Sequence, residues 1–117
     1  MAQKIPNISD SDITRIIKRD FPHSDFDKIE ATLSMYKSES QKGRNRIYAA
    51  ILKLSNGNFE LIKKYVEKAI ADYRDIIALS EYPHYSKHSF DDNLSENEKE
   101  KLIEEDWKQY ENWLHKI

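Results

Sequence analysis

Apolar side chains recur along this chain at steps of three and four residues, which is the spacing of one face of an α-helix. The longest such stripe lies between Asn58 and Pro83 and consists of Phe59, Ile62, Val66, Ala69, Tyr73 and Ile76. Apolar neighbours on both sides widen it, as is typical of a helix that contacts two or more others. The pattern therefore predicts one long, continuous amphipathic helix in the middle of the chain.

Four further stripes at the same spacing predict four more helices. Their predicted bounds are residues 9–21 for a short helix, and 24–37, 44–55 and 95–117 for longer ones. Serine favours the N-cap of a helix, and we expect Ser9 or Ser11 to cap the first of these, Ser24 the second and Ser95 the last. The segment 83–94 follows the helix-ending Pro83 and is rich in aromatic side chains and histidine, so it is predicted to be a loop.

A turn signal joins the third and fourth predicted helices. Gly57 suits the left-handed conformation that follows a helix, and Asn58 can cap the next one, so these two helices are predicted to form an antiparallel hairpin. A chain of 117 residues with two glycines and three prolines fits one domain and disfavours an all-β fold. We predict an all-α, single-domain helical bundle over 9–117, with one short and four longer helices, preceded by an N-terminal arm at 1–8.

Asp72 is an acid set inside the apolar face of the long helix. Rotation of about 100° per residue places it at the edge of the apolar arc, where an unpaired carboxylate would be costly. On the third helix Arg44 falls on the apolar face, while Arg46 and Lys53 point away. Counting back from the turn places Arg44 level with residues 69–72. We therefore predict a partly buried Arg44–Asp72 ion pair that sets the register of the two helices; a charged anchor in a binding cleft is the functional alternative.

The composition excludes several kinds of chemistry. The chain contains no cysteine, so it has no disulfide, thiolate metal site or cysteine nucleophile. Its net charge of −2 predicts no overall attraction to nucleic acid or membranes. No apolar run approaches the ~20 residues of a membrane span, and the start of the chain lacks the apolar segment of a signal peptide. We expect a cytoplasmic protein without a cofactor.

The segment after the long helix holds the only candidates for metal binding. His84 and His88, near Glu81 and two aspartates, are residue types that bind zinc. A four-residue spacing in a loop does not bring two side chains together as a helix does, so we assign no metal site and keep the two histidines as weak candidates. No glycine-rich phosphate loop or nucleophile elbow is present either, so no residue is assigned a catalytic role.

A local excess of positive charge lies on the third helix and just before it. Lys37, Lys42, Arg46 and Lys53 are accompanied by the aromatic side chain of Tyr48. Basic stripes with interleaved aromatics are typical of nucleic-acid binders. Four cations on an acidic chain are few for strong phosphate binding, so a nucleic-acid-associated regulator is the second function considered, after protein interaction.

Part of the chain resembles a pattern found in small, uncharacterised, all-helical bacterial proteins. The residues concerned are 46–58, Asp-Tyr-Arg-Asp at 72–75 and Glu-Tyr-Pro at 81–83. The resemblance implies a bacterial origin and no particular activity. It draws attention to Asp72, Arg74, Asp75 and Glu81 without assigning them roles. We take Arg74, Asp75 and Glu81 as candidate interaction residues.

Spare aromatic side chains and uneven charge favour association with a protein. Tyr82, Tyr85 and Trp113 are further candidates, because an exposed aromatic residue favours an interface; the alternative is that they belong to the core. Residues 1–58 carry 10 basic and 7 acidic side chains, whereas 59–117 carry 9 and 14. The best prediction is a non-catalytic module that binds another protein or a second copy of itself. A small enzyme or metal protein using residues 81–92 is the third alternative.

Overall fold

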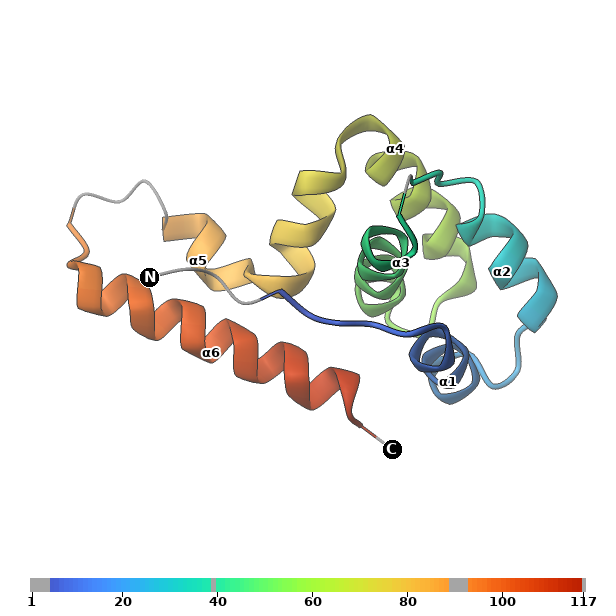
Figure 1. The fold of residues 1–117 in the computed structure, drawn as a ribbon, viewed down its shortest axis with the longest axis horizontal. Helices are drawn as coiled ribbons and strands as arrows, with labels where there is room; N and C mark the ends of the chain where they lie inside the picture. The colour runs from blue at the N-terminus through green and yellow to red at the C-terminus, as the bar shows by residue number, and fades with distance from the viewer. Residues whose placement is uncertain (1–4, 39, 89–92, 117) are drawn as a thin grey trace.

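The computed structural model describes residues 5–38, 40–88 and 93–116, apart from the side chains of residues 41, 42 and 88, and contains six helices in this part of the chain (Figure 1). Their bounds are α1 Asp10–Asp20, α2 Phe26–Leu33, α3 Gln41–Ser55, α4 Phe59–Glu81, α5 Pro83–His88 and α6 Glu96–Leu114. The all-α, single-globule prediction is confirmed. The additional helix, α5, lies where the sequence predicted a loop.

Side-chain caps explain where most helices begin. Ser9 and Asp12 form a reciprocal capping box at α1, with bonds of 3.1 and 3.0 Å. Asp25, rather than the predicted Ser24, caps α2 by accepting from two backbone N–H groups. Ser40 caps α3, which therefore begins three residues earlier than predicted. These interactions are local in sequence, and the boundaries that depend on them are nearly correct.

The predicted α3–α4 hairpin is confirmed. Its turn contains two consecutive left-handed residues, Asn56 at φ 48° and Gly57 at φ 79°. Asn58 then caps α4 by accepting from the Glu60 N–H at 3.0 Å. A Cβ on Gly57 would lie 3.1 Å from the carbonyl oxygen of Asp20 at the end of α1, so both the backbone conformation and the close approach favour glycine.

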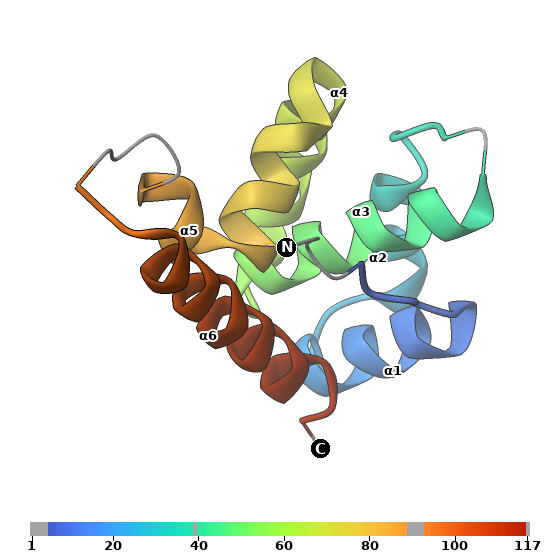
Figure 2. The ribbon, with the colours of Figure 1, turned by 60° about the vertical axis from the view of Figure 1, so that its left-hand side comes forward.

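Helix α3 is the centre of the bundle. It passes between α1 and α4 (Figure 2). Residues on all of its sides are buried, namely Asn45, Ile47, Ala49, Ala50, Ile51, Leu52 and Ser55. Only one apolar face was predicted for it. The run Tyr-Ala-Ala-Ile-Leu at 48–52 places apolar side chains on every side of the middle of α3, which is the pattern of a helix segment that is buried all round.

The two ends of the described chain also pack against the bundle. In the predicted N-terminal arm, Ile8 belongs to the core and its carbonyl accepts from Asn45 Nδ2 at 3.2 Å. At the other end, α6 terminates against α1, where Arg15 donates to the Leu114 carbonyl at 2.7 Å and Arg19 to the Trp113 carbonyl at 2.8 Å. Cationic groups at a helix C-terminus satisfy its free carbonyls and oppose its dipole, so these arginines attach α6 to the first helix.

Helix α4 is not continuous, contrary to the prediction. Asp72 has extended backbone angles of φ −159° and ψ 101°, and a first limb (residues 59–71) meets a second limb (residues 73–81) at a sharp bend (Figure 1). The Asp72 carboxylate accepts from the Arg74 N–H at 3.0 Å, so it caps the second limb. Aspartate competes with helix continuation in this way, and the apolar spacing alone does not reveal it.

Helix α5 replaces the predicted loop over residues 83–88. Pro83 is its first residue, a position where proline is favoured because the missing N–H has no helical partner. The Asp106 carboxylate of α6 accepts from the N–H groups of His84 and Tyr85. The cap therefore comes from a distant helix, which is why the local sequence did not indicate it. The rest of the predicted loop includes residues 89–92, which lie outside the described part of the chain.

Candidate functional site

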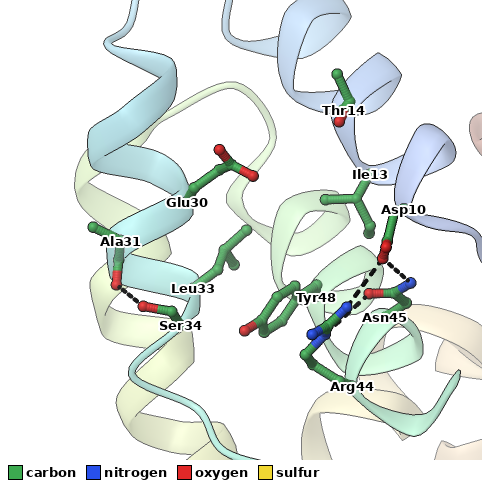
Figure 3. Close-up of a pocket in the computed structure, with 10 residues that line it drawn as sticks. All are labelled: Asp10, Ile13, Thr14, Glu30, Ala31, Leu33, Ser34, Arg44, Asn45 and Tyr48. Atoms are coloured by element: carbon green, nitrogen blue, oxygen red, sulfur yellow. Dashed lines mark hydrogen bonds and ion pairs between the residues drawn. The ribbon is translucent and has the colours of Figure 1, made fainter. Parts of the chain in front are cut away.

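Arg44 and Asp72 do not form the predicted ion pair. Arg44 Nη2 donates to Asp10 Oδ1 at 3.0 Å and Arg44 Nε to Asn45 Oδ1 at 3.3 Å (Figure 3). Asp72 instead binds the guanidinium of Arg74, with Nε to Oδ1 at 3.0 Å, and this bond lowers the pKa of Asp72. The prediction assumed an unbroken α4, and the bend invalidates the helical phase on which it was based.

The surroundings of Arg44 form a hollow of about 510 Å³ between α1, α2 and α3 (Figure 3). The ring of Tyr48 lies between Arg44 and Glu30 in this view. Burial raises the pKa of Tyr48, and the nearby charge of Arg44 opposes that rise. Because Arg44, Asp10 and Asn45 bond to one another on its α1–α3 side, we interpret the hollow as a junction of three helices.

Arg46 and Glu81 form a buried ion pair instead. Glu81 is completely buried, and its two carboxylate oxygens each accept a bond of 2.8 Å from the guanidinium of Arg46, whose side chain is 22% exposed. The bond to Glu81 raises the pKa of Arg46, against the opposing effect of burial. The prediction that Arg46 points away is therefore wrong, and in the single chain Glu81 faces Arg46 rather than the surface. The pair joins α3 to the second limb of α4.

A second buried acid, Asp106, was not singled out from the sequence. Its side chain is fully buried and accepts from His84 Nδ1 at 2.7 Å as well as from the α5 amides. Burial lowers the pKa of Lys53, and the charge of Asp106 opposes that change. Asp106 lies three residues after Ile103 and four before Tyr110, both buried residues of α6. An acid at that spacing on the apolar face was the available signal.

The candidate nucleic-acid and metal residues whose side chains are described are not gathered into sites. Of the four proposed cations, Arg46 is bound to Glu81, Lys53 is partly buried, Lys37 is exposed, and the side chain of Lys42 lies outside the described residues. His84 is held by Asp106, and the side chain of His88 is also outside the description. Where side chains are described, no three His, Asp or Glu residues converge to hold a metal ion.

A groove lies on the surface at the bend of α4. Three adjoining hollows of about 600, 550 and 420 Å³ share Tyr73 in their walls. We call this surface the bend groove. The side chains that define it all line one or more of the three hollows: Met35, Tyr36, Arg46, Ile70, Tyr73, Arg74, Asp75, Ile77, Tyr82 and Tyr85. It is lined by the segment after α2, by α3, by both limbs of α4 and by α5.

Large apolar side chains are exposed in the bend groove. Met35 is 47% exposed, Ile70 56% and Tyr73 49%. Tyr36 is partly buried beside them, and burial together with the nearby Tyr73 raises its pKa. Exposed apolar residues that occur singly need no explanation, but their grouping in one hollow makes this surface a candidate binding site.

The predicted interaction residues divide between the groove and the interior. Arg74, Asp75, Tyr82 and Tyr85 line the groove, although Tyr82 is itself mostly buried. Trp113 lies elsewhere, partly buried on α6, with the Arg19 guanidinium 5.3 Å from its ring centroid. The Asp-Tyr-Arg-Asp segment therefore contributes to the groove because it forms the bend.

No helix in the described part of the chain has the length and apolar character needed to cross a membrane. In comparisons with known proteins, no protein-family model, curated protein or solved structure matches this chain. Its function is therefore inferred from the bend groove itself.

Proposed function

We propose that this protein is a non-catalytic interaction module that binds another protein at the bend groove. The observation that carries the proposal is the exposure of Met35, Ile70 and Tyr73 within one hollowed surface. Burial of an apolar side chain against a partner is worth roughly 25 cal/mol per Å² removed from water. Because these side chains lie in a hollow, a partner that fills it would bury their apolar surface and fit their concave shape.

The composition of the groove also fits a protein partner. Tyrosine, methionine and arginine are enriched in protein interfaces, and tyrosine and arginine are frequent at their energetic centres. Tyr36, Tyr73 and Tyr85 supply rigid aromatic surface, while Arg74 and Asp75 provide exposed charges of both signs. Charges of both signs favour a protein segment over a polyanion, because nucleic acid is attracted by cations alone.

The groove is also close to a rigid support. Arg46 lines it and is bound to the fully buried Glu81, so the wall that it forms is fixed by two charge-assisted hydrogen bonds. A preformed wall lowers the entropy lost on binding. The resemblance of residues 46–58, 72–75 and 81–83 to small bacterial proteins supports a bacterial origin, and we propose the cytoplasm as the place where this binding occurs.

Site-specific cross-linking tests the proposal. A photoreactive amino acid replaces Ile70 in the groove or, as a control, Leu79, which is 49% exposed on the same helix but does not line the groove. The partner identified from Ile70 is then purified, and its affinity is measured for Ile70→Asp and Leu79→Asp. We expect Ile70→Asp to weaken binding at least about tenfold, as for a residue at an interface centre, and Leu79→Asp to leave it unchanged. Equal effects of the two variants would refute the groove as the binding surface.

A further inference from the structure

The bend of α4 interrupts a helical pattern that continues through it. Apolar residues keep their three- and four-residue steps from Phe59 to Ile76, as they would in one straight helix. No glycine or proline lies between residues 59 and 82, although sharp kinks usually occur at such residues. Asp72 alone leaves the helical conformation within α4. A change in the backbone of this one residue would make α4 a single straight helix.

The chain on either side of the bend forms two connected parts. The second limb, α5 and α6 are joined by the Asp106 bonds to α5 and by the bond from Gln109 Nε2 to the Ser80 carbonyl at 3.1 Å. This C-terminal part is bound to the rest by Arg46–Glu81 and by the bonds from Arg19 to the end of α6. If α4 straightened, its own C-terminal part would move out of reach of these partners.

We propose that this chain forms a dimer by exchanging residues 73–116 with a second copy, through straightening of α4 at Asp72. Arg46 of each copy then binds Glu81 of the other, and every contact between the two parts is made again between chains. Such exchange is a low-cost route to a symmetric dimer, because only the hinge changes. The inference deepens the proposed function, on which it rests, by naming a second copy of this chain as the partner that covers the apolar side chains exposed at the bend.

The exposed apolar side chains at the bend support this occupant. Ile70 and Tyr73 flank Asp72, and both are about half exposed in the single chain. In the exchanged dimer the two straight α4 helices cross near residue 72, because the hinge is a single residue and each copy must join the two parts at the same junction. Ile70 and Tyr73 of each copy then face their equivalents, which removes from water the apolar surface that the monomer leaves exposed.

Substitutions at the hinge test the proposal on the purified protein. Asp72→Ala removes the cap and favours a continuous helix, so with two hinges per dimer we expect the association constant to rise about a hundredfold. Tyr73→Pro is compatible with the bent chain, because residue 73 is the first helical residue of the second limb. Proline there prevents a continuous helix, so the association constant should fall about ten-thousandfold. Tyr73→Ala is the control for the lost ring. Light scattering after size exclusion, over a range of concentrations, gives the constants.

Charge reversal distinguishes exchange from any other dimer. Arg46→Glu and Glu81→Arg each place like charges together in a single chain. When the two variants are refolded as a mixture, an exchanged heterodimer restores both opposite-charge pairs. The double variant in one chain shows whether the reversed pair is accepted. We expect the mixture to form a folded heterodimer more stable than either variant alone.

Two results would overturn the proposal. The first is that Asp72→Ala associates no more strongly than Tyr73→Pro at any concentration measured. The second is that the mixture of Arg46→Glu and Glu81→Arg is no more stable than either variant alone, although the double variant folds. If the double variant does not fold, the association constants of Asp72→Ala and Tyr73→Pro alone decide whether the exchange occurs. A chain that remains monomeric but loses affinity for another protein on Ile70→Asp refutes the exchange and leaves the proposed function standing.

Discussion

The Arg46–Glu81 pair provides the sharpest test of how this bundle is held together. Arg46→Met removes the guanidinium and leaves the fully buried Glu81 carboxylate without its two 2.8 Å bonds. Breaking a buried pair from one side costs about 3–5 kcal/mol of unfolding free energy, because the remaining charge is uncompensated. Small domains have about 5–15 kcal/mol in total, so this variant should lose a large part of its stability.

The opposite truncation should cost less. Glu81→Leu leaves Arg46, whose side chain is 22% exposed and can turn its charged end towards water. We expect a loss of about 1–3 kcal/mol, typical of a lost charged hydrogen bond. The double variant, with both charges replaced by apolar groups, should lose less than the sum of the single losses by at least about 2 kcal/mol.

Urea unfolding at pH 7 measures these changes. Helical circular dichroism and tryptophan fluorescence should give coincident transitions if the unfolding is two-state, and the four proteins form a double-mutant cycle. Arg74→Met is the control, because its ion pair with Asp72 is exposed and its loss should not move the midpoint. Strictly additive effects at positions 46 and 81 would refute the description of a coupled, buried pair.

Two further predictions concern the buried groups of α6. Asp106→Ala removes the cap of α5, and the amides of His84 and Tyr85 should exchange hydrogen about tenfold faster, whereas Glu105→Ala, an exposed neighbour, should not change them; unchanged exchange in the Asp106 variant would contradict the cap. Burial raises the pKa of Tyr110 from its ordinary 10.0, so the folded chain keeps this phenol protonated after the unfolded chain has begun to lose its proton. The resulting stability is fully present below about pH 10 and is lost as pH rises further; urea unfolding between pH 8 and 11 should show a steeper decline for wild type than for Tyr110→Phe, and equal slopes would contradict it.

Features determined by neighbouring residues were predictable from the sequence. The Ser9 cap, the Asn56-Gly57 turn and the antiparallel α3–α4 pair follow from side chains within three or four positions of one another. The apolar stripes also identified the all-α class correctly. In each of these cases the local conformational preference and the packing in the folded chain agree.

Features that depend on a distant helix were not predictable in the same way. The α5 cap comes from Asp106, more than twenty residues away, and the partner of Arg46 is on the second limb of α4. The bend at Asp72 adds a different difficulty. A helical wheel assumes a constant rotation per residue, so it assigns wrong faces to every residue that follows an unrecognised break. The bend groove consequently could not be assembled from the sequence, although Arg74, Asp75 and Tyr85 had been selected as candidates.

The bend in α4 creates the groove and serves as the proposed hinge, so its direct observation is the most decisive measurement. Backbone NMR of the dilute monomer reports the conformation of each residue from 59 to 81 through its chemical shifts and sequential amide contacts. We expect helical values on both limbs, extended values at Asp72 alone, and an Arg74 amide bonded to the Asp72 carboxylate. Uninterrupted helical values from Phe59 to Glu81 in the monomer would contradict the bend, and with it the groove and the hinge.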